Sequence, residues 1–242
     1  MVIQEMFKSK RINTLTISTV CLLLTLFQYS CQTNPPSKRI TIASSGKVNS
    51  LDPARANTLK SLQLISSLGD TLYELDNDGE LIPKLASKMP VISKDKLKIS
   101  ISLKKNILFH DGTPFDSKAM KFTIERFQRI GTNNYILDKK IKSIETPNKN
   151  TLIINLNKPT SSLEGLLTSV NLTAISPSFY KNHIDKFLNN NFVGTGQYVL
   201  KSFSNEVQIL DPNLNYWDLK PKNHGINFVG YSNSSSLYGA LK

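Results

Sequence analysis

The sequence is short of the residues that most catalytic and metal sites need. It holds two cysteines in 242 residues, Cys21 inside an apolar run and Cys31 shortly after it, so we predict no disulfide and no cysteine metal site. The three histidines (His110, His183 and His224) lie far apart without metal-ligand spacing, and no Gly-x-Ser-x-Gly motif is present. We therefore predict a protein that is not an enzyme and that has no catalytic residue, metal or cofactor.

Acidic residues are also few, with 18 aspartates and glutamates against 30 lysines and arginines, which gives a net charge of +12. Such an excess can indicate a nucleic acid, an anionic membrane surface or an acidic ligand as the partner. The lysines are scattered, however, and the sequence shows no arginine-rich helix and no stripe of base-stacking aromatic residues. We predict a solvated basic surface and no binding of nucleic acid.

The apolar run at the amino terminus, residues 15–27, is short for a permanent membrane-spanning helix. A basic patch at residues 8–11 precedes it, and this order is typical of a secretory signal peptide. We predict the signal peptide over residues 1–30 and export of the remainder to the cell envelope, the periplasm in a bacterium with two membranes.

Cys31 directly follows the small residue Ser30, which is the pattern of a lipoprotein cleavage site. We predict that Cys31 carries the lipid and that residues 31–38, which are polar and contain two prolines, form a tether to the membrane. Gln28 departs from the aliphatic residue that is usual three positions before such a cysteine. An uncleaved membrane anchor therefore stays as the alternative.

Residues 95–126 contain the signals of a strand, a turn and a helix in succession. Asp111-Gly112 favours a tight turn, because glycine tolerates a positive φ. Asp116 suits the cap of an amphipathic helix that contains Met120, Ile124 and Phe127. Before the turn, apolar residues alternate with polar ones as in a half-buried strand, at Leu97, Ile99, Ile101 and Leu103.

Other segments give weaker signals of the same kinds. Asp78-Gly79 predicts a hairpin turn. Gly46-Lys47 does not form a phosphate-binding loop, because the motif's first glycine, five residues before Gly46, is missing and Val48 replaces its hydroxyl residue. The remaining patterns predict strands at 40–42, 141–144, 152–156 and 198–203, and helices at 59–68, 161–170 and 178–187.

Several short motifs, in this order, resemble family 5 of the bacterial extracellular solute-binding proteins, the oligopeptide- and dipeptide-binding components of ABC importers. The resemblance covers residues 39–242. The motifs are Leu51-Asp52-Pro53, Pro83 with Leu85-Ala86, FHDGTPF at 109–115, GTGQY at 194–198 and NLNYW at 213–217.

The resemblance implies a fold of the α/β class, the type II periplasmic-binding-protein-like fold, in which two lobes close on a ligand. Family members are roughly twice as long as this chain, so we expect a truncated protein that holds the first lobe with its smaller subdomain. We assign the smaller subdomain to residues 58–175 and the large lobe to residues 39–57 and 176–242.

The resemblance also implies the function: a substrate-binding lipoprotein of an ABC transporter that captures peptides or a similar small solute and delivers it to permease subunits. Two alternatives stay open. The chain could be a membrane-anchored half-receptor that pairs with another chain, or a fragment without function.

Two loops supply the candidate ligand-binding residues, because α/β folds place ligands at the loops that leave the ends of strands. The first loop offers Asn49 and Ser50. The second offers Gly194, Thr195 and Gly196, where two glycines allow backbone amides to approach a ligand closely. The alternative for the second loop is a tight turn that leads into the strand at 198–203.

Overall fold

The computed structural model describes residues 38–137, 139–160 and 163–240. The predicted signal peptide, the predicted lipid site at Cys31 and nearly all of the predicted tether lie outside the described residues. The described part of the chain contains two larger sheets, a hairpin and the helices that pack on them.

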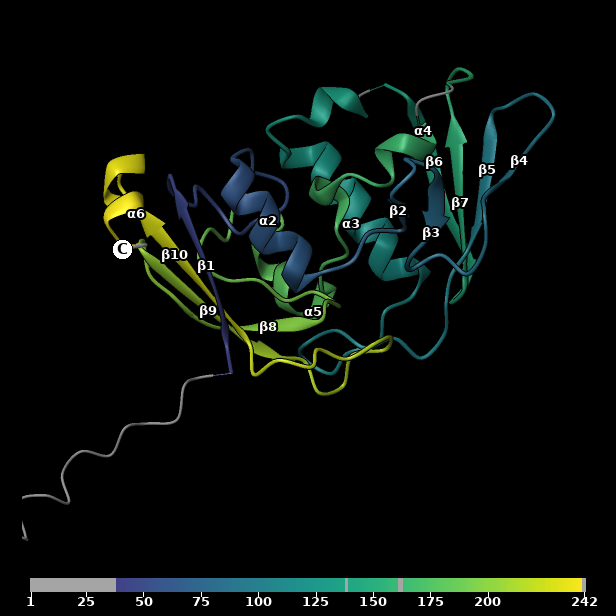
Figure 1. The fold of residues 1–242 in the computed structure, drawn as a ribbon. Coiled ribbons are helices and arrows are strands. Elements are labelled where there is room, and N and C mark those ends of the chain that lie inside the picture. Colours follow the sequence, from purple (N-terminus) through teal and green to yellow (C-terminus); the bar gives the residue numbers. More distant parts are fainter. Residues whose placement is uncertain (1–37, 138, 161–162, 241–242) are drawn as a thin grey trace, which may run out of the picture. The chain divides into compact units, whose positions relative to one another are not determined.

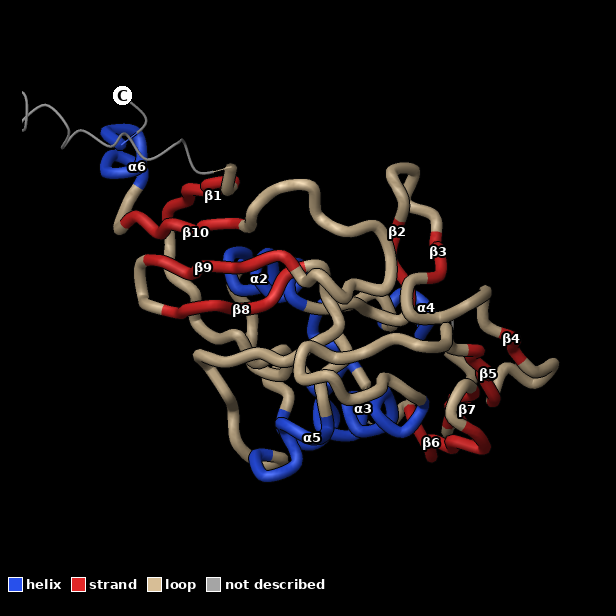
Figure 2. The backbone as a smooth tube through the Cα atoms, turned by 90° about the horizontal axis from the view of Figure 1, so that it is seen from below, coloured by secondary structure: helices blue, strands red, loops and turns tan. Residues whose placement is uncertain are grey.

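The first sheet has four strands in the order β1-β10-β9-β8 (Figure 2). β1 pairs with β10 in parallel, and the other two pairings are antiparallel. Helix α2 (Leu59–Leu68) packs on this sheet through Leu64, Ile65 and Leu68. The strands are β1 (Ile40–Ser45), β8 (Tyr198–Phe203), β9 (Val207–Pro212) and β10 (Ile226–Tyr231).

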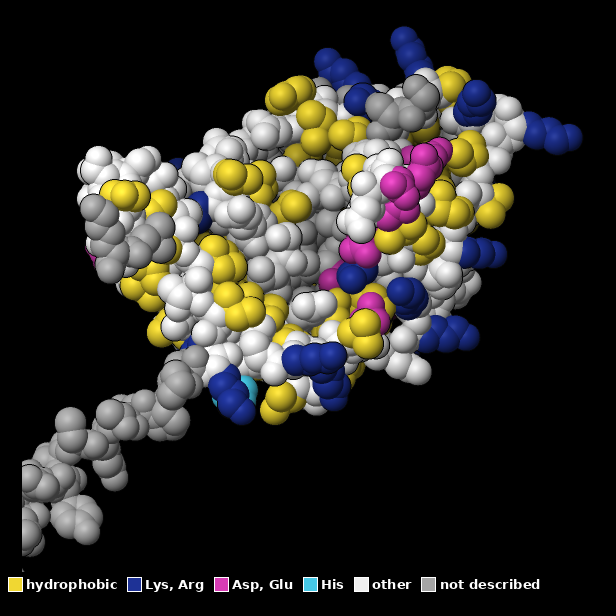
Figure 3. All heavy atoms as spheres, in the orientation of Figure 1, with side chains coloured by type: hydrophobic (Ala, Val, Ile, Leu, Met, Phe, Trp, Pro, Cys, Tyr) yellow, Lys and Arg dark blue, Asp and Glu magenta, His cyan; other side chains and the backbone are white. Residues whose placement is uncertain are grey.

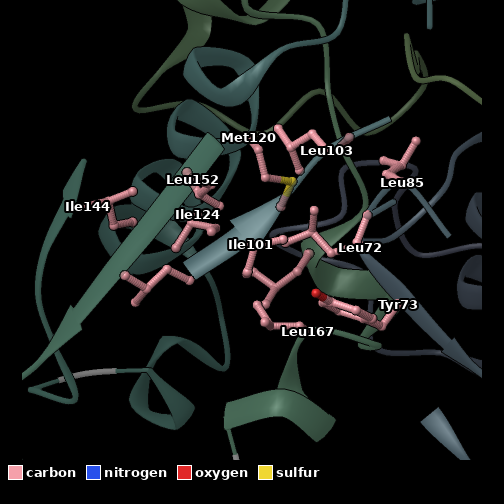
Figure 4. Packing of buried hydrophobic residues seen from close by; sticks show 14 of the residues in the cluster. Leu72, Tyr73, Leu85, Ile101, Leu103, Met120, Ile124, Ile144, Leu152 and Leu167 are labelled. Carbon is pink, nitrogen blue, oxygen red and sulfur yellow. The ribbon is translucent and has the colours of Figure 1, made fainter. Parts of the chain in front are cut away.

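The second sheet is antiparallel throughout, with the order β4-β5-β7-β6. Its apolar face packs against helix α3 (Ser117–Ile130), and Figure 4 shows strand and helix side chains pointing toward one another. A two-stranded hairpin of β2 (Tyr73–Leu75) and β3 (Leu81–Pro83) adds Tyr73 to the same core. The strands of the second sheet are β4 (Val91–Ile92), β5 (Lys98–Ser102), β6 (Ile141–Asn148) and β7 (Thr151–Leu156).

Helix α3 forms where its cap and its apolar spacing agree. The Asp116 side chain accepts a hydrogen bond from the Ala119 amide at 3.0 Å, as predicted, and Met120, Ile124 and Phe127 are buried. Phe122 lies on another side of the helix and packs against the core of the first sheet. Figure 1 shows α2 and α3 between the two sheets.

A buried ion pair joins α3 to the loop that comes after β1. The two Arg126 Nη atoms donate to the two Asp52 carboxylate oxygens at 2.8 and 2.6 Å, and both side chains are at most 1% exposed. Asp52 also accepts from the Leu188 amide, and Arg126 donates to the Lys186 carbonyl. Three segments distant in the sequence are therefore held at one point.

The later helices are shorter than predicted. Helix α4 spans Leu163–Leu166, since the Thr168 hydroxyl bonds the Gly165 carbonyl and Ser169 starts a separate 3₁₀ turn. Helix α5 spans Pro177–Tyr180 instead of 178–187. Backbone groups at 186–188 bond the Asp52–Arg126 pair instead of extending a helix. The other short elements are η2 (Asn134–Ile136), η3 (Val170–Leu172), η4 (Lys181–His183) and α6 (Ser234–Ala240).

The two hydrophobic cores bear on the predicted subdomain boundaries without testing them. The buried residues of α2 belong to the core of the first sheet, although the predicted smaller subdomain begins at residue 58. Ala174 belongs to the second core and Ile175 to the first, at the predicted end of that subdomain. The domain ranges stay a prediction.

Candidate functional site

A hollow of about 370 Å³ lies beside the carboxyl end of α2. Its lining comes from the last turn of α2, the β2–β3 hairpin, the segment around η3, the start of β8 and Tyr216. Figure 3 shows acidic and basic side chains gathered beside a recess on this face. We call this cavity the Asp70 hollow after the buried acid in its wall.

Asp70 is held as a fixed acceptor. The Tyr216 hydroxyl donates to its Oδ1 at 3.0 Å, and its Oδ2 accepts from Trp217 Nε1 at 3.0 Å and from the Thr195 hydroxyl at 2.8 Å. Burial raises the pKa of Asp70, while these three donors and the nearby Lys84 ammonium act to lower it. The carboxylate therefore keeps one orientation in the wall of the cavity.

The charges around the hollow are mainly negative, although the whole chain is basic. Lys84 Nζ lies 3.6 Å from Glu74 and 3.9 Å from Asp218, and above the ring of Trp217 at 5.6 Å. Among the described residues that line the hollow, Asp70 and Glu74 are the acidic ones and Lys84 is the basic one. Asp218 and Lys104 lie outside this lining, Asp218 beside Lys84 and Lys104 above the Trp217 ring at 4.5 Å. A cavity with this balance, and with serine and threonine hydroxyls in its lining, suits a small polar solute that carries a positive group.

Gly194, Thr195 and Gly196 lie behind the hollow and support it. The Gly196 amide bonds the Leu68 carbonyl at 3.0 Å, and a Cβ at Gly196 would collide with the backbone of Leu68 and Gly69. Thr195 is fully buried and donates to Asp70. The glycines let this loop pass against the end of α2.

His110 fixes the same loop from its other side. The Gly194 amide lies 3.5 Å from its Nδ1 and the Gly196 carbonyl 3.2 Å from its Nε2, an arrangement that suits a neutral ring with the proton on Nε2. Burial lowers the pKa of His110 and favours this neutral form. The predicted turn role of the motif is confirmed, because Gly112 has a φ of +78° and Asp111 accepts from the Thr113 amide.

Asn49 and Ser50 lie at the start of α2 instead of in the hollow. Asn49 Oδ1 accepts from the hydroxyls of Thr58 and Ser61 at 3.1 and 2.8 Å. Ser50 is fully buried and donates to Asn189 at 2.8 Å. The structure places Gly194, Thr195 and Gly196 beside the hollow, whereas Asn49 and Ser50 lie away from it. The ligand-binding role of all five residues stays a prediction.

The residues that give the hollow its charge, namely Asp70, Glu74 and Lys84, are absent from the site predicted from the sequence. One feature of the sequence could have identified Asp70 as a site residue. It follows Gly69 at the end of a helix, where neither helix capping nor turn formation favours an acidic residue. The other two stand on or beside short strands and resemble ordinary surface charges.

Comparison with known proteins places the chain among binding proteins. The sequence model of "Bacterial extracellular solute-binding proteins, family 5 Middle" matches residues 80–242. The chain is 28% identical over 214 residues to the probable D,D-dipeptide-binding periplasmic protein DdpA of Escherichia coli K12, covering 84% of this chain and 41% of that protein.

Two further proteins are similar to most of this chain. The glutathione-binding protein GsiB of an Escherichia coli O1:K1 strain is 29% identical over 170 residues, with 69% of this chain and 33% of GsiB covered. The structure of NikZ from Campylobacter jejuni in complex with Ni(L-His) superposes with a TM-score of 0.77 at 25% identity, covering 86% of this chain and 42% of NikZ. The chain therefore spans less than half the length of these relatives and has the predicted mixed α/β periplasmic-binding-protein fold.

Proposed function

The chain belongs to family 5 of the bacterial extracellular solute-binding proteins, and from that premise we propose that it captures a small polar solute for an ABC importer. Binding proteins of this kind are not enzymes, which agrees with the prediction from the sequence. Permease subunits of the importer are the partners that this function requires.

The Asp70 hollow is the observation that carries the proposal. Its volume of about 370 Å³ falls within the range of about 300–1,000 Å³ that is usual for small-molecule sites. Its walls come from segments that pack on both hydrophobic cores, and three hydrogen bonds fix Asp70 before any ligand arrives. A prepared polar wall of this kind reduces the cost of ordering the site on binding.

The charges of the hollow point to a solute with an amino group. Glu74 is half-exposed and bonded only loosely to Lys84, so it can turn to meet a cation. A dipeptide and glutathione, named for two of the relatives, both carry an amino group. We propose peptides or similar amines as the solute class.

Titration calorimetry of the full chain with a dipeptide, glutathione and the nickel–histidine complex tests this proposal. Glu74→Gln should weaken binding of the preferred solute about tenfold, because it removes a charge from the wall. Glu145→Gln, which changes an exposed glutamate bonded to Asn155, is the matched control and should bind as well as the parent chain. Failure of every solute to bind, or an equal effect of both variants, would contradict the proposal.

We further propose that Cys31 is lipidated and anchors the protein in the cell envelope. Among the described residues, no helix has the length and apolar character to cross a membrane. Metabolic labelling with a radioactive fatty acid tests the anchor: the parent chain should take up label and Cys31→Ser should not. Equal labelling of both would refute the assignment.

The free edge of β1 favours a second candidate function, pairing with another chain. Among the described residues β1 pairs only with β10, and Ile40 and Ile42 are 48% and 37% exposed. An exposed apolar edge strand is a template for strand addition. Sedimentation analysis decides: assembly at micromolar concentration that Ile42→Lys abolishes would favour pairing, and a monomer throughout would exclude self-pairing.

A further inference from the structure

A second polar cluster lies on the face of the first sheet that α2 covers, and it shares no residue with the Asp70 hollow. Three side-chain atoms there are buried and have no hydrogen-bond partner within the part of the chain that the structure describes. They are Lys60 Nζ, Ser44 Oγ and Gln208 Oε1. A helix–sheet interface is usually apolar, so three such atoms on one face need an explanation.

The register of β1 and β10 places the lysine and the serine together. A Cβ at Gly230 would collide with Lys60 Nζ, so the ammonium group lies directly over Gly230. Ser44 pairs with Gly230 across the parallel strands, and paired residues point to the same face about 4.8 Å apart. The Lys60 ammonium and the Ser44 hydroxyl are therefore neighbours near the carboxyl ends of both strands.

Gln208 extends this polar region along β9. It pairs with Phe228, two residues before Gly230, so its side chain points to the same face of the sheet. Its Nε2 donates to the Ser204 carbonyl at 2.6 Å, while its Oε1 has no donor among the described residues.

Packing does not explain why a lysine is buried at position 60. Lys60 is 5% exposed and forms no ion pair with any described residue, and burial lowers its pKa. A buried charge without a partner costs stability, and an apolar side chain of similar length would fill the same space at lower cost. An anion beside the ammonium group would offset that cost.

The end of β1 is open to solvent close to the ammonium group. Gly46 follows β1 with a φ of +97° and is exposed, and no atom beyond its chain neighbours lies within 4 Å of the position that a Cβ would take there. Its carbonyl oxygen and that of Glu206 lie 3.3 and 3.4 Å from the Cβ position of Gly230, beside the Lys60 ammonium. The carboxyl ends of strands are also where α/β folds commonly bind ligands. We propose that Lys60 and Ser44 form a binding site for a carboxylate group at the carboxyl ends of β1 and β10.

In this site the Lys60 ammonium donates to one carboxylate oxygen and the Ser44 hydroxyl donates to the other. Charge-assisted hydrogen bonds of this kind are about twice as strong as neutral ones. The site goes beyond the proposed capture of an amine in the Asp70 hollow. A molecule with a single carboxylate, such as acetate, is sufficient to occupy it.

NMR of the full chain with ¹³C-labelled lysine side chains tests the site, with sodium acetate as the probe and sodium chloride at equal ionic strength as the control. Acetate should shift the Lys60 signal saturably, and saturation should raise the pH at which Lys60 titrates. Ser44→Ala should weaken acetate binding about tenfold, because it removes one of the two donors. Sodium chloride should neither shift the Lys60 signal saturably nor raise the pH at which Lys60 titrates.

Two lysine variants complete the experiment, followed through the Gly230 amide. Lys60→Met should lose the acetate response, and it should stay folded because it removes a buried charge. Lys47→Met, which changes an exposed lysine in the adjacent loop, should keep the response. A Lys60 signal that acetate leaves unchanged, or an undiminished response in Lys60→Met, would overturn the proposal. Because no transported solute is used, the result does not depend on whether the Asp70 hollow binds one.

Discussion

Individual buried polar residues set much of this structure, and the Asp52–Arg126 pair is the plainest case. Two hydrogen bonds join the partners and each also bonds the backbone at 186–188, so the loss of one leaves the other charged and buried. The motif Leu51-Asp52-Pro53 stands out in the sequence only as a family feature. Its physical role, to join the first loop to α3, is visible in the structure alone.

Arg126→Met should destabilise the protein by about 3–5 kcal/mol, because it leaves Asp52 buried without its counter-charge. Arg129→Met is the matched control on the same helix. Its pair with Asp185 is more than half exposed, so the loss should stay below about 1 kcal/mol. Urea unfolding of both variants measures the difference. Equal losses of unfolding free energy would show that the buried pair stabilises the fold no more than the exposed pair does.

His110 should make stability depend on pH. Because burial lowers its pKa, the unfolded chain binds more protons than the folded protein just below the ordinary histidine value of about 6.5. The His110 contribution is therefore complete above that pH and is lost as the pH falls toward the lowered pKa. The loss is at most about 1.4 kcal/mol per pH unit.

Urea unfolding of the parent chain between pH 7 and pH 5 measures this slope. His110→Gln should flatten it, since glutamine does not titrate. His224→Gln removes an exposed histidine and should leave the slope unchanged. A parent slope that survives in His110→Gln would assign the effect to other groups.

At the scale of elements, close backbone packing supports the candidate site. Gly196→Ala should destabilise the protein by about 1–3 kcal/mol, because the added methyl group would collide with the backbone of Leu68 and Gly69. Gly165→Ala, in α4, meets no atom within 4 Å and should be neutral or stabilising by up to about 1 kcal/mol. Thermal melting of both variants tests the contrast. A harmless Gly196→Ala would mean that the loop is free to move away from α2.

Local patterns predicted the elements that local forces determine. Helix α2 spans the predicted residues 59–68, helix α3 begins directly after its predicted cap Asp116, and the Asp78-Gly79 and Asp111-Gly112 turns form as expected. Helices α4 and α5 are shorter than predicted. Side chains of the same segment, Thr168 and Ser169, bond the backbone where α4 ends, whereas the backbone at 186–188 bonds the distant Asp52–Arg126 pair instead of extending α5. Only the second kind of competition is invisible in a single segment.

Neither the parallel pairing of β1 with β10 nor the Asp70 hollow could be derived from local pattern. The paired strands are separated by most of the chain, and the wall of the hollow combines residues near positions 70, 84, 197 and 216. The family resemblance supplied the fold class instead. The lipid at Cys31 and the five predicted ligand-binding residues remain predictions.

For the molecule as a whole, a basic chain surrounds an acidic cavity. The net charge is +12, yet the described lining of the Asp70 hollow has two carboxylates, Asp70 and Glu74, against one lysine, Lys84. Charge of this sign at one place on a basic surface favours a cationic group there over the rest of the protein. Capture of the solute should therefore take place in this hollow.

Amide NMR of the full chain during titration with a dipeptide locates the bound solute directly. Capture in the hollow predicts saturable shifts of the backbone amides that line it, Gly69, Thr71 and Gln197, with little change at the exposed hairpin turn near Gly79. Shifts confined to other parts of the fold would contradict capture there, as would the absence of any saturable change with the dipeptide, glutathione and the nickel–histidine complex in turn.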